Sequence, residues 1–243
     1  MTLDGLTKAY GDLPVLDGVS LTVGRGEFVA VVGPSGCGKS TLFDVVAGLE
    51  PPDGGRVLVD GVDVTGRTDA FAYMPQQDLL FPWRTVLDNT TLGLEVAGVR
   101  RRAARERARP LFAEFGLGGF EGARPGELSG GMRQRAALLR TVVQERPVLL
   151  LDEPFGALDA LTRADMQVWL AGVRARFEWT VVLVTHDIRE AVFLADRVVV
   201  LGPRPTSVRR EVSVDLPRPR DLVTITDPAF AAAEAELLGS LVR

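Results

Sequence analysis

Residues 28–49 read FVAVVGPSGCGKSTLFDVVAGL, an apolar β-branched run followed by a glycine-rich turn and a segment with helical spacing. A strand, a glycine-rich turn and a helix in this order are the context in which a phosphate-binding loop occurs. The glycines let successive backbone N–H groups converge on phosphate oxygens, and the amino end of the helix adds partial positive charge. The stretch therefore predicts a nucleoside triphosphate site in an α/β domain, with a plain glycine-rich turn as the alternative.

This predicted nucleotide-binding loop consists of Gly33, Pro34, Ser35, Gly36, Cys37, Gly38, Lys39, Ser40 and Thr41. Lys39 would bridge the β- and γ-phosphates, Ser40 would place its hydroxyl on Mg²⁺, and Thr41 would lie on the side of the α-phosphate. We interpret Cys37 as a small filler of the loop, because no second cysteine or nearby base supports a reactive thiol. ATP and Mg²⁺ are the expected cofactors.

Further apolar runs at 148–151, 181–185 and 198–201 predict buried strands. They are separated by longer segments with helical spacing, which indicates a largely parallel sheet shared with the strand at 28–32. Since sheets of this kind bind ligands at the carboxyl ends of their strands, we look for functional side chains there.

Other segments predict structure around this sheet. The polar and apolar alternations at 3–10 and 15–23 are typical of an antiparallel β layer at one edge, and glycines flank a short strand at 56–60. Residues from about 85 to 145 read as a mainly helical insert.

The carboxyl-terminal segment reads as a linker and a short helix. Residues 216–221, LPRPRD, are punctuated by prolines, and Phe230, Leu237, Leu238 and Leu241 recur at roughly helical spacing. We therefore divide the chain into a domain at 1–215 and a tail at 216–243.

Two carboxylates end the strand of residues 148–153, VLLLDE. Asp152 fits a residue that holds Mg²⁺ through water, and Glu153 fits one that polarises the attacking water. Adjacent residues on a strand point to opposite faces, so the two acids should differ in role until the chain turns at Pro154. Solvated acids at a strand end are the alternative, and the nucleotide-binding loop upstream favours the catalytic interpretation.

His186, the only histidine, directly follows the strand of residues 181–185. We expect it to hydrogen-bond the γ-phosphate and to hold the attacking water in line. A single histidine is more often structural, so this prediction depends on the two motifs that precede it.

The composition excludes several classes of protein. The 243 residues include 28 basic and 32 acidic side chains, for a net charge of −4, which disfavours nucleic acid as a partner. One cysteine cannot close an internal disulfide, and residues 1–10 lack the apolar core of a signal peptide, so a cytoplasmic location is expected. Crossing a bilayer takes about 20 apolar residues, far more than any run here.

Residues 128–135 read LSGGMRQR. Ser129, Gly130 and Gly131 at a helix start would form a second anion site from a hydroxyl, exposed N–H groups and the helix dipole, with a plain serine N-cap as the alternative. Placed shortly before the acid-ended strand, this signature segment resembles that of ABC-type ATPases. The resemblance covers about residues 1–215 and implies an α/β fold: a P-loop NTPase core of the ABC ATPase type with an antiparallel β edge layer and a helical insert.

The resemblance assigns roles to further residues. Tyr10 would lie under the adenine, Gln76 in the Q-loop, and Asp159 in the D-loop of residues 157–159. It implies a catalytic set of Glu153, His186, Gln76 and Asp159, a metal set of Ser40, Gln76 and Asp152, and a nucleotide-binding set of Tyr10, residues 33–41, Ser129, Gly130 and Gly131.

The resemblance also implies partners. In this family the signature serves the ATP held by the other subunit, which implies a head-to-tail homodimer with two shared ATP molecules. It further implies a separate integral membrane permease, a solute-binding protein acting indirectly, and a peripheral position on the cytoplasmic face of the membrane.

Several segments point to a subgroup of this family. LLFPWRTVLDN at 79–89 and DEPFGALDALTR at 152–163 are similar to importer ATPases of the nitrate, sulfonate and taurine group, some relatives of which serve thiamine-precursor pyrimidines. Pro75 before Gln76 departs from that pattern.

Two alternatives stay open. A soluble ABC ATPase of repair or translation would need a long coiled-coil insert or a second cassette, and neither is present in this sequence. A P-loop small-molecule kinase would have no use for LSGG.

The apolar cluster of Leu79, Leu80, Phe81 and Trp83 either packs under the insert or lines a groove for a permease helix. The six arginines within 100–109 favour a solvated helix face over an anionic-lipid or nucleic-acid contact.

Overall fold

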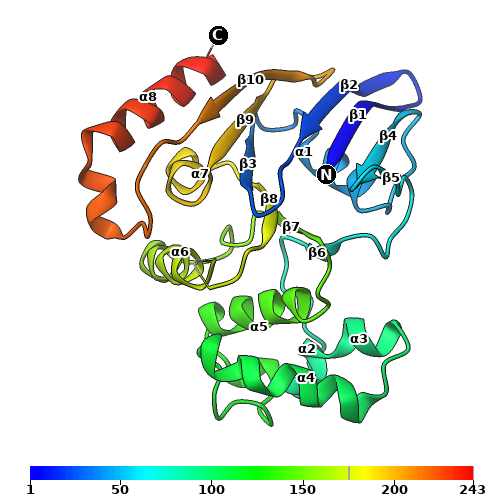
Figure 1. The fold of residues 1–243 in the computed structure, drawn as a ribbon, viewed down its shortest axis with the longest axis vertical. Helices are drawn as coiled ribbons and strands as arrows, with labels where there is room; N and C mark the ends of the chain where they lie inside the picture. Colours follow the sequence, from blue (N-terminus) through cyan, green and yellow to red (C-terminus); the bar gives the residue numbers. More distant parts are fainter. Residues whose placement is uncertain (175, 243) are drawn as a thin grey trace.

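Strand β3 (Phe28–Val32) lies inside a six-stranded sheet whose order is β10-β9-β3-β8-β7-β6 (Figure 1). The computed structural model describes residues 1–174 and 176–242. Its other strands are β6 (Ala72–Met74), β7 (Val148–Asp152), β8 (Thr180–Val184), β9 (Arg197–Leu201) and β10 (Val208–Ser213). All neighbours pair in parallel except β9 and β10. The predicted largely parallel sheet is confirmed, and β6 and β10 are additions to it.

Both faces of this sheet are buried, which explains why its strands are continuous apolar runs. Phe28, Ala30 and Val32 of β3 face the core shared with the helical insert. Val29 and Val31 face a second core, formed with α1 (Lys39–Val46) and a separate four-stranded sheet. The strand therefore carries the nucleotide-binding loop on a rigid base.

The four-stranded sheet has the order β2-β1-β4-β5 and is antiparallel. It consists of β1 (Thr2–Tyr10), β2 (Leu13–Thr22), β4 (Gly54–Val59) and β5 (Val62–Asp63). The predicted antiparallel layer is thus confirmed, and the short strand predicted at 56–60 begins two residues earlier and joins the same layer. Its buried positions, such as Leu3 and Leu6, pack towards α1.

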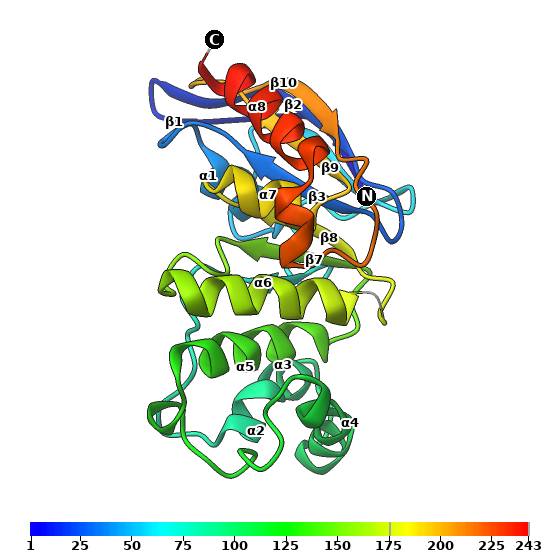
Figure 2. The ribbon, with the colours of Figure 1, turned by 90° about the vertical axis from the view of Figure 1, so that its left-hand side faces the viewer.

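The helical insert follows β6. It contains α2 (Val86–Thr90), α3 (Leu92–Val96), α4 (Arg101–Glu114), the 3₁₀ turn η1 (Pro125–Glu127) and α5 (Gly130–Val142). Figure 2 shows α6 (Ala160–Arg174) lying between the strands and α5. Within the insert, the buried carboxylate of Asp88 accepts from Arg101 and Arg105 at 2.6 and 2.8 Å, so two of the six clustered arginines hold α4 against α2.

The predicted tail packs on the domain. Helix α8 (Pro228–Val242) contacts α7 (Ile188–Leu194), β9 and β10, and it buries Phe230 and Leu237 while Leu238 is exposed. The 3₁₀ turn η2 (Leu222–Thr226) precedes it. No helix in the described part of the chain is long and apolar enough to cross a membrane.

Residues 216–221 were expected to form a linker, and they are held firmly instead. The buried guanidinium of Arg220 donates to the carbonyl groups of Val192, Phe193 and Ala195 at 2.9, 3.2 and 2.6 Å. These are among the last carbonyls of α7, which lack partners inside the helix and attract positive charge. Burial, and secondly the charge of Arg218, lower the pKa of Arg220 to about 10. Arg220 thus joins the segment to α7.

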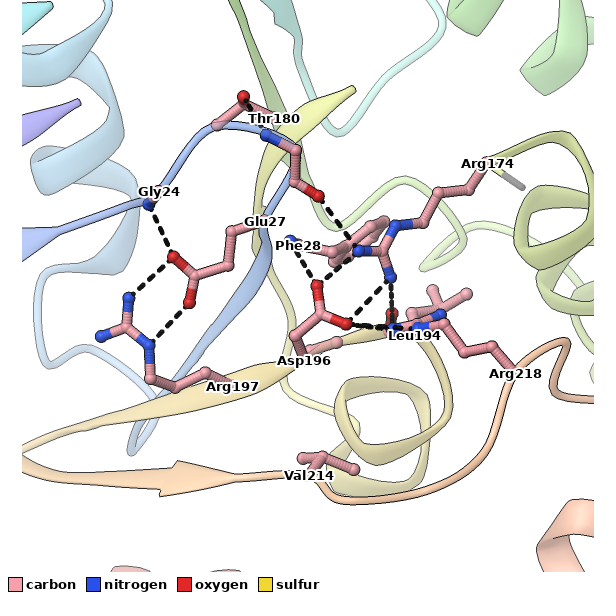
Figure 3. Close-up of polar contacts among 12 residues, drawn as sticks. Gly24, Glu27, Phe28, Arg174, Thr180, Leu194, Asp196, Arg197, Val214 and Arg218 are labelled. Atoms are coloured by element: carbon pink, nitrogen blue, oxygen red, sulfur yellow. Dashed lines mark hydrogen bonds and ion pairs between the residues drawn. The ribbon is translucent and has the colours of Figure 1, made fainter. Parts of the chain in front are cut away.

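A second polar cluster lies at the amino end of the same sheet (Figure 3). The Asp196 carboxylate accepts from the backbone N–H of Phe28 at 2.9 Å, from Arg218 at 2.7 Å and from Arg174. Arg174 also lies 5.1 Å from the centre of the Phe28 ring. Asp196 therefore ties α6, β3 and the 216–221 segment together.

Candidate functional site

The nucleotide-binding loop leaves β3 at Gly33 and enters α1 at Lys39. Gly36 and Gly38 have φ angles of +73° and +113°, which side chains rarely allow. A Cβ on Gly38 would also lie 2.7 Å from Val15 Cγ1. These two positions require glycine, so the loop has the backbone expected of a phosphate cradle.

The loop is braced from the β9–β10 connection. Thr206 is fully buried, and its hydroxyl donates to the carbonyl of Cys37. The backbone N–H of Thr206 donates to the carbonyl of Val15, and its carbonyl accepts from the N–H of Asp17, both at 2.8 Å. These hydrogen bonds tie the connection to β2 as well. The thiol of Cys37 is buried against Gly33, where a Cβ would lie 3.0 Å from Sγ. Thr206 was not predicted from the sequence, since nothing near it marks a contact 169 residues away along the chain.

Lys39 lies within the cradle, with its side chain largely buried. Its ammonium group donates to the carbonyls of Gly33 and Pro34 at 2.9 and 3.1 Å. Ser40 is exposed beside it and Thr41 is half-buried. The lysine charge therefore lies inside the loop, where it can meet phosphate oxygens.

Asp152 ends β7 with its carboxylate nearly buried. Burial, then the negative charges of Glu153 and Asp44, raise the pKa of Asp152 to about 6. The Tyr73 hydroxyl donates to it at a long 3.4 Å. Because these acids repel one another beside Lys39, the site favours a cation that would relieve the crowding.

Glu153 brings distant motifs together. Its Oε2 atom accepts from Gln76 Nε2 at 3.1 Å and lies 3.1 Å from His186 Nδ1. These residues follow β6, β7 and β8, three neighbouring strands of the sheet, so their carboxyl ends meet at one edge. Gln76, Glu153 and His186 therefore meet at one point, and the catalytic roles expected for them stay predictions.

The backbone turn lies one residue earlier than the sequence suggested. Glu153 itself has a φ of +42°, an uncommon left-handed conformation for a residue with a side chain. The chain thus leaves the strand at Glu153, not at Pro154. The carboxylates of Asp152 and Glu153 therefore already occupy different positions at the end of the strand. Backbone strain of this kind is often retained at functional sites.

His186 is exposed, and Asp187 directly after it caps α7 by accepting from the backbone N–H of Arg189 and Glu190 at 2.9 and 3.2 Å. Asp159 is also exposed and accepts from the N–H groups of Leu161 and Thr162, both at 3.1 Å, at the start of α6. Asp159 is therefore held at the start of α6, and His186 directly precedes the residue that caps α7.

The signature residues are not brought to the loop of the same chain. Ser129 caps α5 by accepting from the N–H of Met132 at 3.2 Å, and among the described residues no hydrogen bond joins it to the nucleotide-binding loop. A Cβ on Gly131 would lie 3.0 Å from Thr162 Cγ2, so this glycine allows α5 to approach α6 closely. Gly130 lies beside it, half-exposed.

Tyr10 lies at the turn between β1 and β2 with 46% of its surface exposed. Lys8 Nζ is 5.3 Å from the centre of its ring, so the ring carries a cation on one side. An exposed ring fits a surface on which a nucleobase could stack.

The comparisons with known proteins agree on one family. A sequence model described as ABC transporter matches residues 16–156. The aliphatic sulfonates import ATP-binding protein SsuB of Ralstonia nicotianae is 47% identical over 236 residues, 97% of this chain and 79% of that protein. An uncharacterized ABC transporter ATP-binding protein of Methanocaldococcus jannaschii is 44% identical over 229 residues, 93% of this chain and 86% of that protein.

Solved structures give the same result. A bacterial ABC transporter cassette in dimeric form aligns with a TM-score of 0.73 and 32% identity, over 88% of this chain and 98% of that one. The same cassette in a dimeric post-hydrolysis state, bound to ADP and Pi, aligns with a TM-score of 0.74 and 31% identity, with the same coverage. The chain accordingly belongs to the ABC transporter family, as an ATP-binding ATPase of that family.

Proposed function

We propose that this chain is the energy-coupling subunit of an importer, hydrolysing ATP to drive a separate membrane permease. The observation that carries the proposal is the meeting of Gln76, Glu153 and His186 on one carboxylate oxygen, at 3.1 Å in each case. A base, an amide and an imidazole at one point can activate and orient a water molecule. Phosphate binding alone would not require them.

Each residue has a role in this proposal. Glu153 accepts the proton of the attacking water, His186 donates to the γ-phosphate, and Lys39 neutralises charge on the β- and γ-phosphates. Ser40, Asp152 and Gln76 would hold Mg²⁺, which supplies charge neutralisation on the phosphate oxygens when bound.

The second copy would complete each site. At the start of α5, Ser129 is exposed and Gly130 is half-exposed, whereas Gly131 is buried. Among the described residues, no hydrogen bond joins these three to the nucleotide-binding loop of the same chain. A helix start of this kind binds anions, so it can serve the triphosphate of a partner copy. Asp159 would add a contact at the dimer interface, and Tyr10 would lie under the adenine. The dimeric state of the similar cassettes supports this arrangement.

The proposed permease contact lies after Gln76. Leu79 and Trp83 are 55% and 67% exposed, whereas Leu80 is buried. Trp83 stacks on Phe81 at 5.0 Å, which makes a rigid apolar surface. This surface suits a short helix of a permease on the cytoplasmic side of a membrane. The names of similar proteins, aliphatic sulfonates import ATP-binding proteins, support a sulfonate or a related small solute such as nitrate or taurine as the cargo.

Reconstitution tests the proposal. The chain, its permease and its solute-binding protein would be placed in vesicles and assayed for ATP-dependent uptake of nitrate, sulfonates, taurine and pyrimidines. We expect uptake of one class, and its loss with Lys39→Ala, which removes a charge that contacts the phosphates. ATP hydrolysis that no permease or solute stimulates would favour an ABC ATPase unrelated to transport.

A further inference from the structure

Two catalytic loops are followed directly by helices that lie side by side. The D-loop, ending at Asp159, leads into α6, and His186 leads into α7. The two helices are in contact with each other. A side chain that joins their first turns could therefore fix the position of one loop relative to the other.

Arg163, in the first turn of α6, makes this connection. Its Nη2 donates to the carbonyl of Leu158 in the D-loop at 3.0 Å. Its Nη1 lies 3.9 Å from Oδ2 of Asp187, the residue after His186. About 70% of both side chains is buried, since they are 29% and 30% exposed. One planar guanidinium thus contacts both loops.

A second contact lies about one turn further along both helices. Gln167 Nε2 donates to Oε2 of Glu190 at 3.3 Å, and Glu190 is almost fully buried. Side chains three or four residues apart share one face of a helix, so Arg163 and Gln167 face α7 together, as Asp187 and Glu190 face α6. The two contacts form a ladder between the starts of the helices.

This ladder is incompletely satisfied. Arg163 Nε and Glu190 Oε1 are buried and have no hydrogen-bond partner among the described residues. A buried polar atom without a partner costs free energy, and natural proteins keep few of them.

We propose that Arg163 is a positioning residue that holds the D-loop and His186 in a fixed relation, so that a shift of either loop on nucleotide binding is passed to the other. The inference rests on the proposed roles of His186 and Asp159. Among the described residues, the Arg163 side chain forms no hydrogen bond or ion pair with the nucleotide-binding loop or with Glu153. Its effect should therefore appear in turnover and leave the binding of ATP unchanged.

The test compares Arg163→Met with wild type and with Arg163→Lys. Methionine keeps the apolar stem and removes all donors, while lysine keeps the charge but cannot span both loops with a planar fork. We expect Arg163→Met to lower kcat roughly 10- to 100-fold, the loss that a small misplacement of catalytic groups produces. The dissociation constant for ATP should stay within about twofold of wild type, and Arg163→Lys should restore part of kcat.

Arg189→Met is the matched control. Arg189 lies on α7 and also contacts a carboxylate, Glu234 of α8, at 3.9 Å, but among the described residues it forms no hydrogen bond or ion pair with the D-loop. We expect it to turn over like wild type. If Arg163→Met does not fold, Asp187→Asn removes the opposite charge while an asparagine still caps α7. Asp187→Asn should then also lower kcat.

A double-mutant cycle with His186→Ala, in single-turnover assays, separates positioning from general damage. If Arg163 acts through His186, the double mutant should be little slower than His186→Ala alone. Full additivity, or a wild-type kcat for both Arg163→Met and Asp187→Asn, would overturn the inference. If His186→Ala itself turned over like wild type, the proposed catalytic role of His186 would fail instead, independently of Arg163.

Discussion

The two ends of the central sheet treat their carboxylates in opposite ways. At the amino end, burial opposes the ionisation of Asp196, but Arg174, Arg218 and the N–H of Phe28 outweigh it and hold the pKa of Asp196 below its usual range. At the carboxyl end, burial and two neighbouring acids raise the pKa of Asp152 to about 6. Asp196 and Asp152 both lie beside buried apolar strands, so the opposite directions of their pKa shifts come from the charged groups and N–H donors next to each of them.

The amino end completes its own charge pairs, and the carboxyl end does not. Arg174 and Arg218 converge on Asp196, and Glu27 accepts two hydrogen bonds from Arg197 at 2.8 and 3.1 Å (Figure 3). At the carboxyl end, Lys39 donates to backbone carbonyls while the acids repel one another. The first arrangement stabilises the fold, and the second leaves charge to be met by nucleotide and cation.

The largest effect should follow from Glu153→Gln. An amide cannot accept the proton of water, so we expect kcat to fall on the order of 10³-fold, a typical contribution of general base catalysis. The protein should be at least as stable as wild type, because a negative charge beside Asp152 is removed. Steady-state ATP hydrolysis and thermal unfolding check both parts. Turnover at the wild-type rate would show that Glu153 is not the base.

Asp196→Ala should do the reverse, lowering stability while leaving the nucleotide site intact. It leaves Arg174 and Arg218 without their carboxylate, which we expect to cost about 2–3 kcal/mol of unfolding free energy, below the value for fully buried pairs because Asp196 is partly exposed. Urea unfolding and ATP titration are the measurements.

Arg25→Ala is the control for that prediction, since it breaks the exposed pair with Asp60 at 2.7 Å and should change little. A large loss of ATP affinity in Asp196→Ala would mean that the two ends of the sheet are coupled.

The two ends also differ in how much of them the sequence revealed. The turn from strand to helix around residues 33–41 could be predicted, because it depends on local spacing and on glycine. Glu153 and His186 could be placed because parallel strands bring their carboxyl ends together. Gln76 could not be placed in this way, because its strand β6 was not predicted.

The features that were missed depend on contacts between distant segments. Residues 216–221 look like a linker because their prolines dominate the pattern, whereas Arg220 becomes structural only through carbonyls of α7. Strand β6 has three residues, too few to show a period, and pairs with β7 far along the chain. Neither Thr206 nor Arg163 lies in a motif that marks its role.

The smallest predicted effect concerns Glu190, a carboxylate between the two ends on α7. Burial, then the charge of Asp187, raise the pKa of Glu190 to about 8 from an ordinary 4.5. Between these two values the folded protein holds one proton more than the unfolded chain, so this group lowers the unfolding free energy as pH rises, by at most about 1.4 kcal/mol per pH unit. Below about pH 4.5 the effect vanishes, because both states are then protonated.

Glu190→Gln replaces the acid with a neutral group of similar shape that does not titrate. We expect it to match wild type near pH 4, where Glu190 is protonated in both states, and to exceed it by roughly 1–2 kcal/mol at pH 7.5, after allowance for relaxation around the buried charge. Urea unfolding at the two pH values measures the difference, and Glu106→Gln, at an exposed position on α4, provides the control. A Glu190→Gln protein less stable by the same amount at both pH values would mean that Glu190 is ionised in the fold and that its contact with Gln167 is charge-assisted.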